Sequence, residues 1–197
     1  MSFSQFDLNP RLQDAIRALG YLKPTPIQTQ AIPPVLAAQY FIGLAQTGTG
    51  KTAAFARPIR QRLIDGPRVK LLALVVAPTR ELAEESHDAF GELGRKTGLR
   101  SVTLYGGVSM SAQVHKLHEG ADIAIACPGR LLDHVAQKTI SLAQIEVLVL
   151  DEADHMFDMG FLPDVRRILK AVPAQRQTLM FSATMPCLLY TSDAADE

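Results

Sequence analysis

The sequence is poor in the residues that mark extracellular, metal-binding and membrane proteins. It has 2 cysteines, Cys127 and Cys187, and no tryptophan in 197 residues, which leaves no disulfide framework and no cysteine-rich metal site. No apolar run approaches the roughly 20 residues that span a bilayer. The N-terminus also lacks the basic segment and apolar core of a secretory signal. We therefore expect a monomeric protein of the reducing cytoplasm, without a membrane segment.

A net charge is missing as well, because 20 basic and 20 acidic side chains cancel. Residues 187–197 contribute three acidic side chains and no basic one, so the remainder carries 20 positive and 17 negative charges, a net of +3. Such a mild excess does not by itself indicate a nucleic-acid-binding protein. Any surface for nucleic acid must therefore be local.

The C-terminal segment 187–197 has an unusual sequence, Cys-Leu-Leu-Tyr-Thr-Ser-Asp-Ala-Ala-Asp-Glu. It matches a translation of DNA that resembles a transposase adapter used in preparing sequencing libraries. We therefore hypothesise that this tail is non-native, that the natural reading frame is left at Pro186 and that the chain is a fragment. The alternative is an ordinary polar C-terminus. The codons of the source DNA across 187–197 distinguish the two.

Short apolar runs divide the rest of the chain. They are uninterrupted rather than alternating, which is typical of strands that are covered on both faces of a parallel sheet. The runs are 41–45, 71–77, 102–105, 123–126, 147–150 and 178–181. Between them apolar residues recur at helical spacing, as in Phe161, Val165, Ile168 and Leu169. This alternation predicts an α/β domain with a doubly wound parallel sheet.

The first apolar run leads into a segment whose composition suits the binding of phosphate. Residues 45–52 read Ala-Gln-Thr-Gly-Thr-Gly-Lys-Thr, and a glycine-bearing loop of this kind can turn its backbone N–H groups around phosphate oxygens. Lys51 adds a positive charge, and Thr52 adds a hydroxyl for Mg²⁺. Because Ala45 replaces the first glycine and such patterns also arise by chance, the loop predicts a nucleotide site without establishing one.

A second motif, Asp151-Glu-Ala-Asp154, follows the apolar run 147–150. Alone it could be an acidic helix start, which the helix dipole favours. Its place after a buried strand, about a hundred residues beyond the loop, instead suggests that Asp151 binds Mg²⁺ and that Glu152 activates water. The two motifs together predict a nucleoside-triphosphate hydrolase.

A motif follows each of the six apolar runs, and these six motifs should lie together, because ligands of a doubly wound sheet bind outside the carboxyl ends of the strands. Three of these motifs have features that suit the binding of a sugar–phosphate chain. Helix starts, a hydroxyl and guanidinium groups can bind phosphate, and glycines let a ligand come close to the backbone. Their residues are Pro78, Thr79, Arg80, Gly106, Gly107, Pro128, Gly129 and Arg130. Each could be an ordinary turn or helix start, but their shared edge favours a second ligand.

Two further motifs complete the pattern, Gly-Tyr-Leu-Lys-Pro-Thr-Pro-Ile-Gln at 20–28 and Ser182-Ala-Thr184. With them the sequence resembles the N-terminal RecA-like domain of bacterial-type DEAD-box ATP-dependent RNA helicases, over residues 1 to about 186. Residues 20–28 look like the family's Q motif. The resemblance implies that Gln28 reads the adenine edge of ATP, that Tyr21 stacks on the adenine and that Phe3 is the family's upstream aromatic residue.

The resemblance also implies a role for each remaining motif. The implied catalytic residues are Lys51, Asp151 and Glu152, and the implied Mg²⁺ ligands are Thr52 and Asp151. The implied nucleotide-binding residues are Tyr21, Gln28, Gln46, Thr47, Gly48, Thr49, Gly50, Lys51 and Thr52. Asp154, Ser182 and Thr184 would couple hydrolysis to strand opening. The eight residues of the second-ligand segments would contact the RNA backbone regardless of base sequence.

The sequence departs from the family at several positions. Ala38-Gln-Tyr40 stands where the family usually has a Gly-Arg-Asp-like turn, and Arg57 and Arg60 occupy helix positions that are more often aliphatic. Cys127 replaces a commoner threonine and is expected to be a small buried residue. We expect these changes to affect packing behind the phosphate loop and to leave the loop itself intact.

The largest departure is that no second RecA-like domain follows Pro186. We expect a Q-motif segment at 1–30, a RecA-like ATP-binding domain at 31–186 and the non-native tail at 187–197. Since the missing domain supplies arginines to the ATP site, the chain alone should bind ATP weakly and hydrolyse it negligibly. The alternatives are a DNA helicase or translocase of the same superfamily, which the Q motif disfavours, and an RNA-binding module without turnover.

Overall fold

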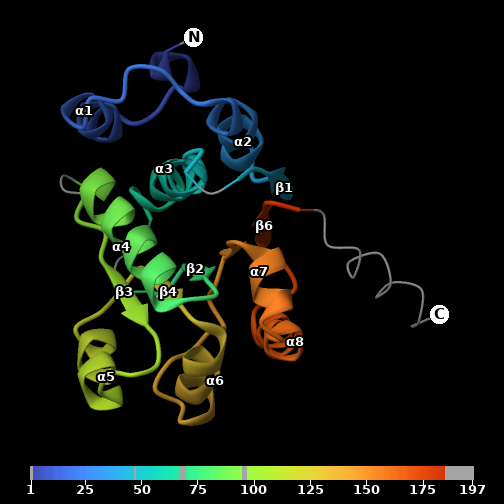
Figure 1. The fold of residues 1–197 in the computed structure, drawn as a ribbon. Helices are drawn as coiled ribbons and strands as arrows, with labels where there is room; N and C mark the ends of the chain where they lie inside the picture. Colours follow the sequence, from blue (N-terminus) through green and yellow to red (C-terminus); the bar gives the residue numbers. More distant parts are fainter. Residues whose placement is uncertain (1, 47, 67–69, 95–96, 185–197) are drawn as a thin grey trace.

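The computed structural model describes residues 2–46, 48–66, 70–94 and 97–184. Helices and strands alternate along the chain (Figure 1). The elements are η1 Phe3–Phe6, α1 Pro10–Ala18, α2 Pro26–Leu36, β1 Phe41–Leu44, α3 Lys51–Leu63, β2 Ala73–Val76, α4 Arg80–Gly94, β3 Ser101–Leu104, α5 Met110–His118, β4 Ile123–Ala126, α6 Pro128–Ala136, β5 Val147–Leu150, α7 Ala153–Asp158, α8 Leu162–Ala171 and β6 Gln177–Ser182. None of the helices in the described ranges combines the length and the apolar character of a membrane span.

The strands form one sheet in the order β1-β6-β5-β2-β4-β3, and every neighbouring pair is parallel. The predicted doubly wound parallel sheet is therefore confirmed. At the centre, Val76 is in register with Ala126 on one side and Leu150 on the other. Because all strands point the same way, the segments that follow them lie at one edge of the sheet.

The central strands β2, β4 and β5 are buried on both faces, whereas the edge strand β1 leaves Ile42 and Leu44 exposed. Ala73 and Val75 of β2 belong to a core cluster that includes residues of α1 to α4, whereas Leu74 and Val76 belong to a second cluster with residues of α6, α7 and α8. Figure 1 shows these two groups of helices on either side of the strands. Burial of successive residues on opposite faces explains why the central strands are continuous apolar runs.

The turn between α2 and β1 contains one of the departures from the family. Ala38 adopts a φ of 57°, in the left-handed region that is uncommon for residues with a Cβ. The neighbouring Tyr40 is exposed. The turn is thus formed, but with a residue that is less suited to it than glycine.

Candidate nucleotide and nucleic-acid site

The predicted phosphate loop connects β1 to α3. Gly48 and Gly50 have φ values of 81° and 86°, which glycine adopts without strain. The hydroxyl of Thr49 donates to the backbone oxygen of Gln46 at 2.7 Å. A Cβ at Gly50 would lie 2.5 Å from Nε2 of Gln28, so a side chain at residue 50 would displace Gln28.

The charged residues of the two motifs meet beside this loop. Lys51 begins α3, and its Nζ lies 3.3 Å from Oε1 of Glu152. Glu152 itself has a φ of 51°, a conformation that a non-glycine residue seldom adopts and that is found at functional sites. Asp151 is buried, and its Oδ1 accepts from the N–H of Glu152 at 3.1 Å. The predicted loop residue Thr47 lies outside the described residues.

Burial governs the protonation of Asp151. It raises the pKa of the Asp151 carboxyl to about 6, while the charge of Lys51 acts in the opposite direction and that of Glu152 adds to the increase. The folded protein therefore holds an acid whose charged form is disfavoured until a cation compensates it. Such a perturbation by burial is common at functional sites.

Thr52 and Asp151 line the same cavity and are the candidate Mg²⁺ ligands. A hydroxyl and a carboxylate are hard oxygen ligands, and Mg²⁺ commonly takes one or two carboxylates together with substrate phosphates. Within the described ranges no cluster of three or more His, Cys, Asp and Glu side chains is arranged to hold a metal. The residues present thus fit a Mg²⁺ ion that arrives with phosphates better than a resident metal.

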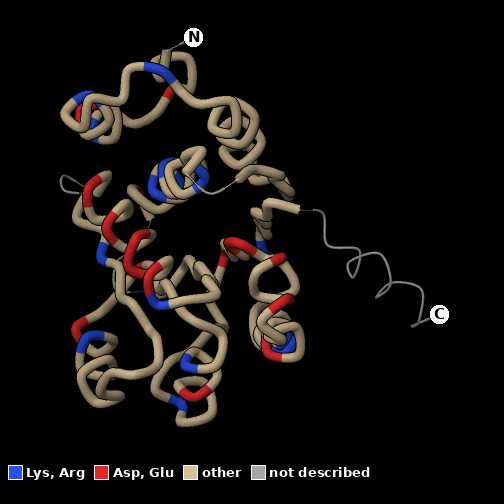
Figure 2. The backbone as a smooth tube through the Cα atoms, viewed as in Figure 1, with Lys and Arg blue, Asp and Glu red and all other residues tan. Residues whose placement is uncertain are grey.

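A cavity of about 340 Å³ joins these groups. It is lined by Tyr21, the phosphate loop, the start of α3, Asp151 with Glu152, and one face of α4. On that face Glu85, Asp88 and Glu92 make the wall acidic, and Figure 2 shows the acidic positions that follow one another along α4. This acidic wall was not predicted from the sequence, although spacings of three and four residues place side chains on one helix face.

Gln28 and Tyr21 lie against the phosphate loop, but in different ways. Tyr21 is 42% exposed and borders the cavity. Gln28 is 2% exposed and its Nε2 donates to the backbone oxygen of Gly50 at 3.2 Å. Its Oε1 accepts from the N–H of Thr25 at 3.3 Å and from Nη1 of Arg57 at 2.9 Å. The amide of Gln28 is therefore bound inside the protein, and Gln28 does not line the cavity.

Asp154 connects α7 to the end of β6. Its Oδ2 accepts from the N–H groups of Ala183 and Thr184 at 3.1 and 2.9 Å and from the Thr184 hydroxyl at 3.0 Å. Its own N–H donates to Oγ of Ser182 at 3.3 Å. Burial alone would raise the pKa of Asp154, but the hydrogen bonds from Thr184 and Ser182 outweigh it and lower the pKa. The three predicted coupling residues thus form one hydrogen-bonded group.

The predicted sugar–phosphate segments follow β2, β3 and β4, which are neighbours in the sheet. α4 begins at Arg80, and the hydroxyl of Thr79 accepts from the N–H of Leu82 at 3.3 Å, as side chains do at helix starts. The exposed residues of these segments are Arg80, Gly106, Gly107 and Gly129, and the buried ones are Pro78 and Pro128.

Two arginines are held over these strand ends. Nη1 of Arg130 donates to the backbone oxygen of Val108 at 3.1 Å, which links α6 to the loop after β3. The guanidinium of Arg80 lies 4.9 Å from the ring centre of Tyr105, whose hydroxyl donates to Glu84. Tyr105 and Glu84 were not predicted, because no motif singles them out.

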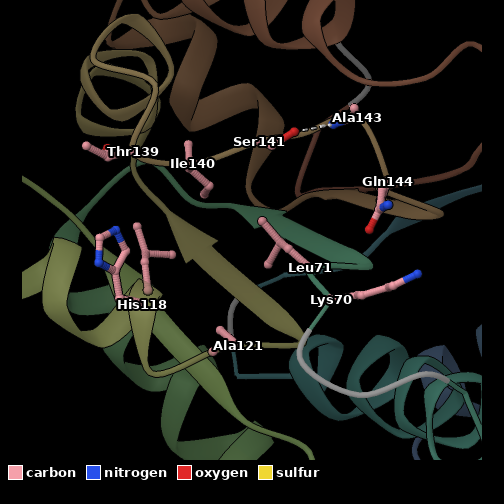
Figure 3. Close-up of a pocket in the computed structure, with 11 residues that line it drawn as sticks. Lys70, Leu71, His118, Ala121, Thr139, Ile140, Ser141, Ala143 and Gln144 are labelled. Atoms are coloured by element: carbon pink, nitrogen blue, oxygen red, sulfur yellow. Dashed lines mark hydrogen bonds between the residues drawn. The ribbon is translucent and has the colours of Figure 1, made fainter.

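Another cavity, of about 420 Å³, lies at the opposite edge of the sheet (Figure 3). Its lining comes from the segments that lead into β2, β4 and β5 and includes Lys70, His118 and Gln144. None of the predicted site residues belongs to this lining. The candidate site is therefore the carboxyl edge.

Comparison with known proteins decides the family. A family profile described as DEAD/DEAH box helicase matches residues 25–189. The chain belongs to the DEAD/DEAH box helicase family. The resemblance that the sequence motifs indicated is thereby confirmed.

Individual DEAD-box relatives show how much of the family this chain contains. The ATP-dependent rRNA helicase RRP3 of Meyerozyma guilliermondii is 49% identical over 93% of this chain and 39% of its own length. The ATP-dependent RNA helicase CshA of Listeria monocytogenes is 45% identical over 93% of this chain and 35% of its own length. The crystal structure of a DEAD box protein from Methanococcus jannaschii matches with a TM-score of 0.91 and 38% identity over 96% of this chain and 52% of that chain. The chain thus spans between a third and about half of the length of these relatives.

Proposed function

We propose that this chain is the ATP-binding half of an ATP-dependent RNA helicase. The observation that carries the proposal is the meeting of Lys51, Asp151 and Glu152 in one cavity beside the phosphate loop. The relatives are named as ATP-dependent RNA helicases, which supports ATP and RNA as the two ligands of the carboxyl edge.

In this proposal the phosphates of ATP lie in the loop 46–52 and replace Glu152 as the partner of Lys51. Glu152 then orients the attacking water. Thr52 and Asp151 would hold Mg²⁺, which neutralises phosphate charge when bound. That neutralisation is important here because the acidic face of α4 would otherwise repel a polyphosphate.

The second ligand would lie along the ends of β2, β4 and β3. Helix starts at Arg80 and Pro128 and the guanidinium of Arg130 suit phosphate oxygens, and such contacts do not read bases. Asp154 joins the nucleotide side to the end of β6 through its bonds to Ser182 and Thr184. We propose that this group couples hydrolysis to strand opening.

A complete catalytic site would need a second RecA-like domain that supplies arginines. An arginine finger contributes roughly 10³–10⁵ in rate to phosphoryl transfer. This chain alone should therefore bind ATP and hydrolyse it no faster than a Lys51→Ala variant. Steady-state ATP turnover with and without single-stranded RNA measures this, and RNA-stimulated turnover above the variant would contradict the half-site.

Binding of labelled single-stranded RNA, followed by fluorescence anisotropy, tests the RNA assignment. Replacing Arg130 with Ala should weaken RNA binding several-fold, whereas Arg166→Ala, at an exposed position on α8, should leave it unchanged. Equal effects of the two variants would contradict the proposed RNA surface. A DNA strand of the same sequence is the second arm, and tighter binding of DNA would favour a DNA helicase or translocase.

A further inference from the structure

A buried polar side chain connects α5 to its surroundings. Gln113 is the one buried residue of this helix, all of which is described, and it is 5% exposed. Its Nε2 donates to the backbone oxygen of Tyr105 at 2.9 Å, and its Oε1 lies 3.0 Å from Nε2 of His134 on α6. These three residues, which we call the buried bridge, join the loop after β3 to the helix that follows the neighbouring strand β4 (Figure 1).

The directions of the hydrogen bonds in the buried bridge follow from their chemistry. Because the amide nitrogen of Gln113 faces a carbonyl oxygen, its amide oxygen faces the imidazole, and Nε2 of His134 is therefore the donor. His134 is 0% exposed, and its Nδ1 lies 2.8 Å from the hydroxyl oxygen of Thr139. Burial lowers the pKa of His134, and the charge of Arg130 acts in the same direction while that of Asp133 opposes it. The imidazole is therefore neutral at pH 7, and the bridge consists of neutral hydrogen bonds in the interior.

α6 has a second, outer connection to the same loop. Arg130 lies one turn before His134 on the same face of α6, and its Nη1 donates to the backbone oxygen of Val108 at 3.1 Å. In the proposed function Arg130 binds an RNA phosphate, which would compete with Val108 for the guanidinium. The buried bridge does not include Arg130, so it would keep the loop in place while Arg130 turns to the RNA.

The buried bridge also reaches a third segment through Tyr105. The backbone oxygen of Tyr105 accepts from Gln113, while its ring centre lies 4.9 Å from the guanidinium carbon of Arg80 at the start of α4. Gly106 and Gly107 follow Tyr105 directly in the sequence. Tyr105 thus connects the segments that follow β2, β3 and β4, and a shift of this residue would change the spacing between them.

We propose that Gln113 and His134 are positioning residues of the RNA surface, which fix the loop 106–107 against the start of α6 so that both meet phosphates of one strand. The inference rests on the proposed function, in which these segments bind the RNA backbone. Binding groups act together only where their supporting residues hold them in place, so loss of the bridge should cost one phosphate contact. For single strands each contact contributes about 0.7 to the slope of log K against log salt, and its loss weakens binding about fivefold at about 0.1 M salt.

The test is binding of labelled single-stranded RNA to the full chain, followed by fluorescence anisotropy at several salt concentrations. Gln113→Met keeps the length of the side chain and removes both of its hydrogen bonds. Its RNA affinity should fall about fivefold at about 0.1 M salt, and the slope of log K against log salt should become shallower by about 0.7. Binding of a fluorescent ATP analogue should be unchanged, because the buried bridge does not line the nucleotide cavity.

Two further variants separate positioning from stability. Gln137→Met, at an exposed position just beyond α6, is the matched control and should keep the wild-type affinity and slope. The double variant Gln113→Met/His134→Leu replaces both partners with apolar side chains, so the imidazole no longer lacks an acceptor, and stability in urea denaturation should recover. Its RNA affinity should stay low, because the bridge is still absent.

Three results would overturn the inference. They are an unchanged slope and affinity in Gln113→Met, a loss of ATP-analogue binding as large as the loss of RNA binding, and recovery of RNA affinity together with stability in the double variant. Failure of the wild type to bind RNA, or RNA binding that is insensitive to Arg130→Ala, would instead overturn the proposed RNA surface, and the inference with it.

Discussion

Replacement of Asp151 by Asn should stabilise the protein at neutral pH, because the site keeps a buried charge there. The carboxyl has a pKa of about 6 in the folded protein against an ordinary value of 3.8. Each pKa unit corresponds to about 1.4 kcal/mol, so the charged form costs about 3 kcal/mol at pH 8. Asparagine has nearly the same shape and can still accept from the N–H of Glu152.

The gain in unfolding free energy from Asp151→Asn should increase with pH. Since the folded pKa lies above the unfolded one, the favourable contribution of the protonated carboxyl is fully present below about pH 3.8 and is lost as the pH rises through about 6. Asparagine does not titrate. The difference in unfolding free energy between Asp151→Asn and the wild type should therefore be small near pH 4 and rise to at most about 3 kcal/mol above pH 7.

Urea denaturation at several pH values between 4 and 8, with EDTA present, measures this difference. The matched control is Asp65→Asn, at an exposed position beyond α3, which should change the unfolding free energy by less than about 0.5 kcal/mol at every pH. A less stable Asp151→Asn variant at pH 8, or a difference that is independent of pH, would refute the reasoning.

Three further outcomes are expected. Arg60→Leu should raise the unfolding free energy by about 1–2 kcal/mol in urea denaturation. The reason is that burial lowers the pKa of Arg60 to about 10 and leaves its Nε without a partner among the described residues. A destabilised variant would show that the hydrogen bonds of Arg60 to Thr97 and Phe90 outweigh the cost of burying its charge. Ala38→Gly should add about 1 kcal/mol in the same assay, because φ is 57° there; an unchanged midpoint would argue against strain in the turn. In a Cys187→Ser background, iodoacetamide should modify Cys127 about 100-fold more slowly at pH 8 than it modifies an unperturbed thiol. The reason is that burial and the charge of Glu81 raise the pKa of Cys127 to about 11. A reaction rate like that of a free thiol would contradict the raised pKa.

The sheet and the edge that carries the candidate site could be predicted from the sequence, because a parallel strand that is buried on both faces leaves a continuous apolar run. The runs 123–126 and 147–150 coincide with β4 and β5. The parallel order then places the segments after the strands together without further information. Ser182 differs slightly, since it is the last residue of β6 rather than the first residue after it.

Contacts between segments distant in the sequence could not be predicted, because they depend on how helices pack. Arg57 stands out in the sequence as a charged residue at a helix position that is more often aliphatic, but its position between Phe3 and Tyr21 follows from the packing of η1 and the segment before α2 against α3. The bonds from Asp154 to Thr184 likewise join residues 30 positions apart. By contrast, the acidic face of α4 could have been found from helical spacing alone.

The most direct test of the nucleotide site is equilibrium binding of a fluorescent ATP analogue to the full chain, with the wild type compared with Lys51→Ala. Lys51 lies in the cavity with Asp151 and Glu152. We predict saturable binding by the wild type that weakens at least about tenfold in Lys51→Ala, equivalent to about 1.4 kcal/mol, and that weakens again when EDTA removes Mg²⁺. Equal binding by the two proteins, or binding that is insensitive to both changes, would contradict the ATP site.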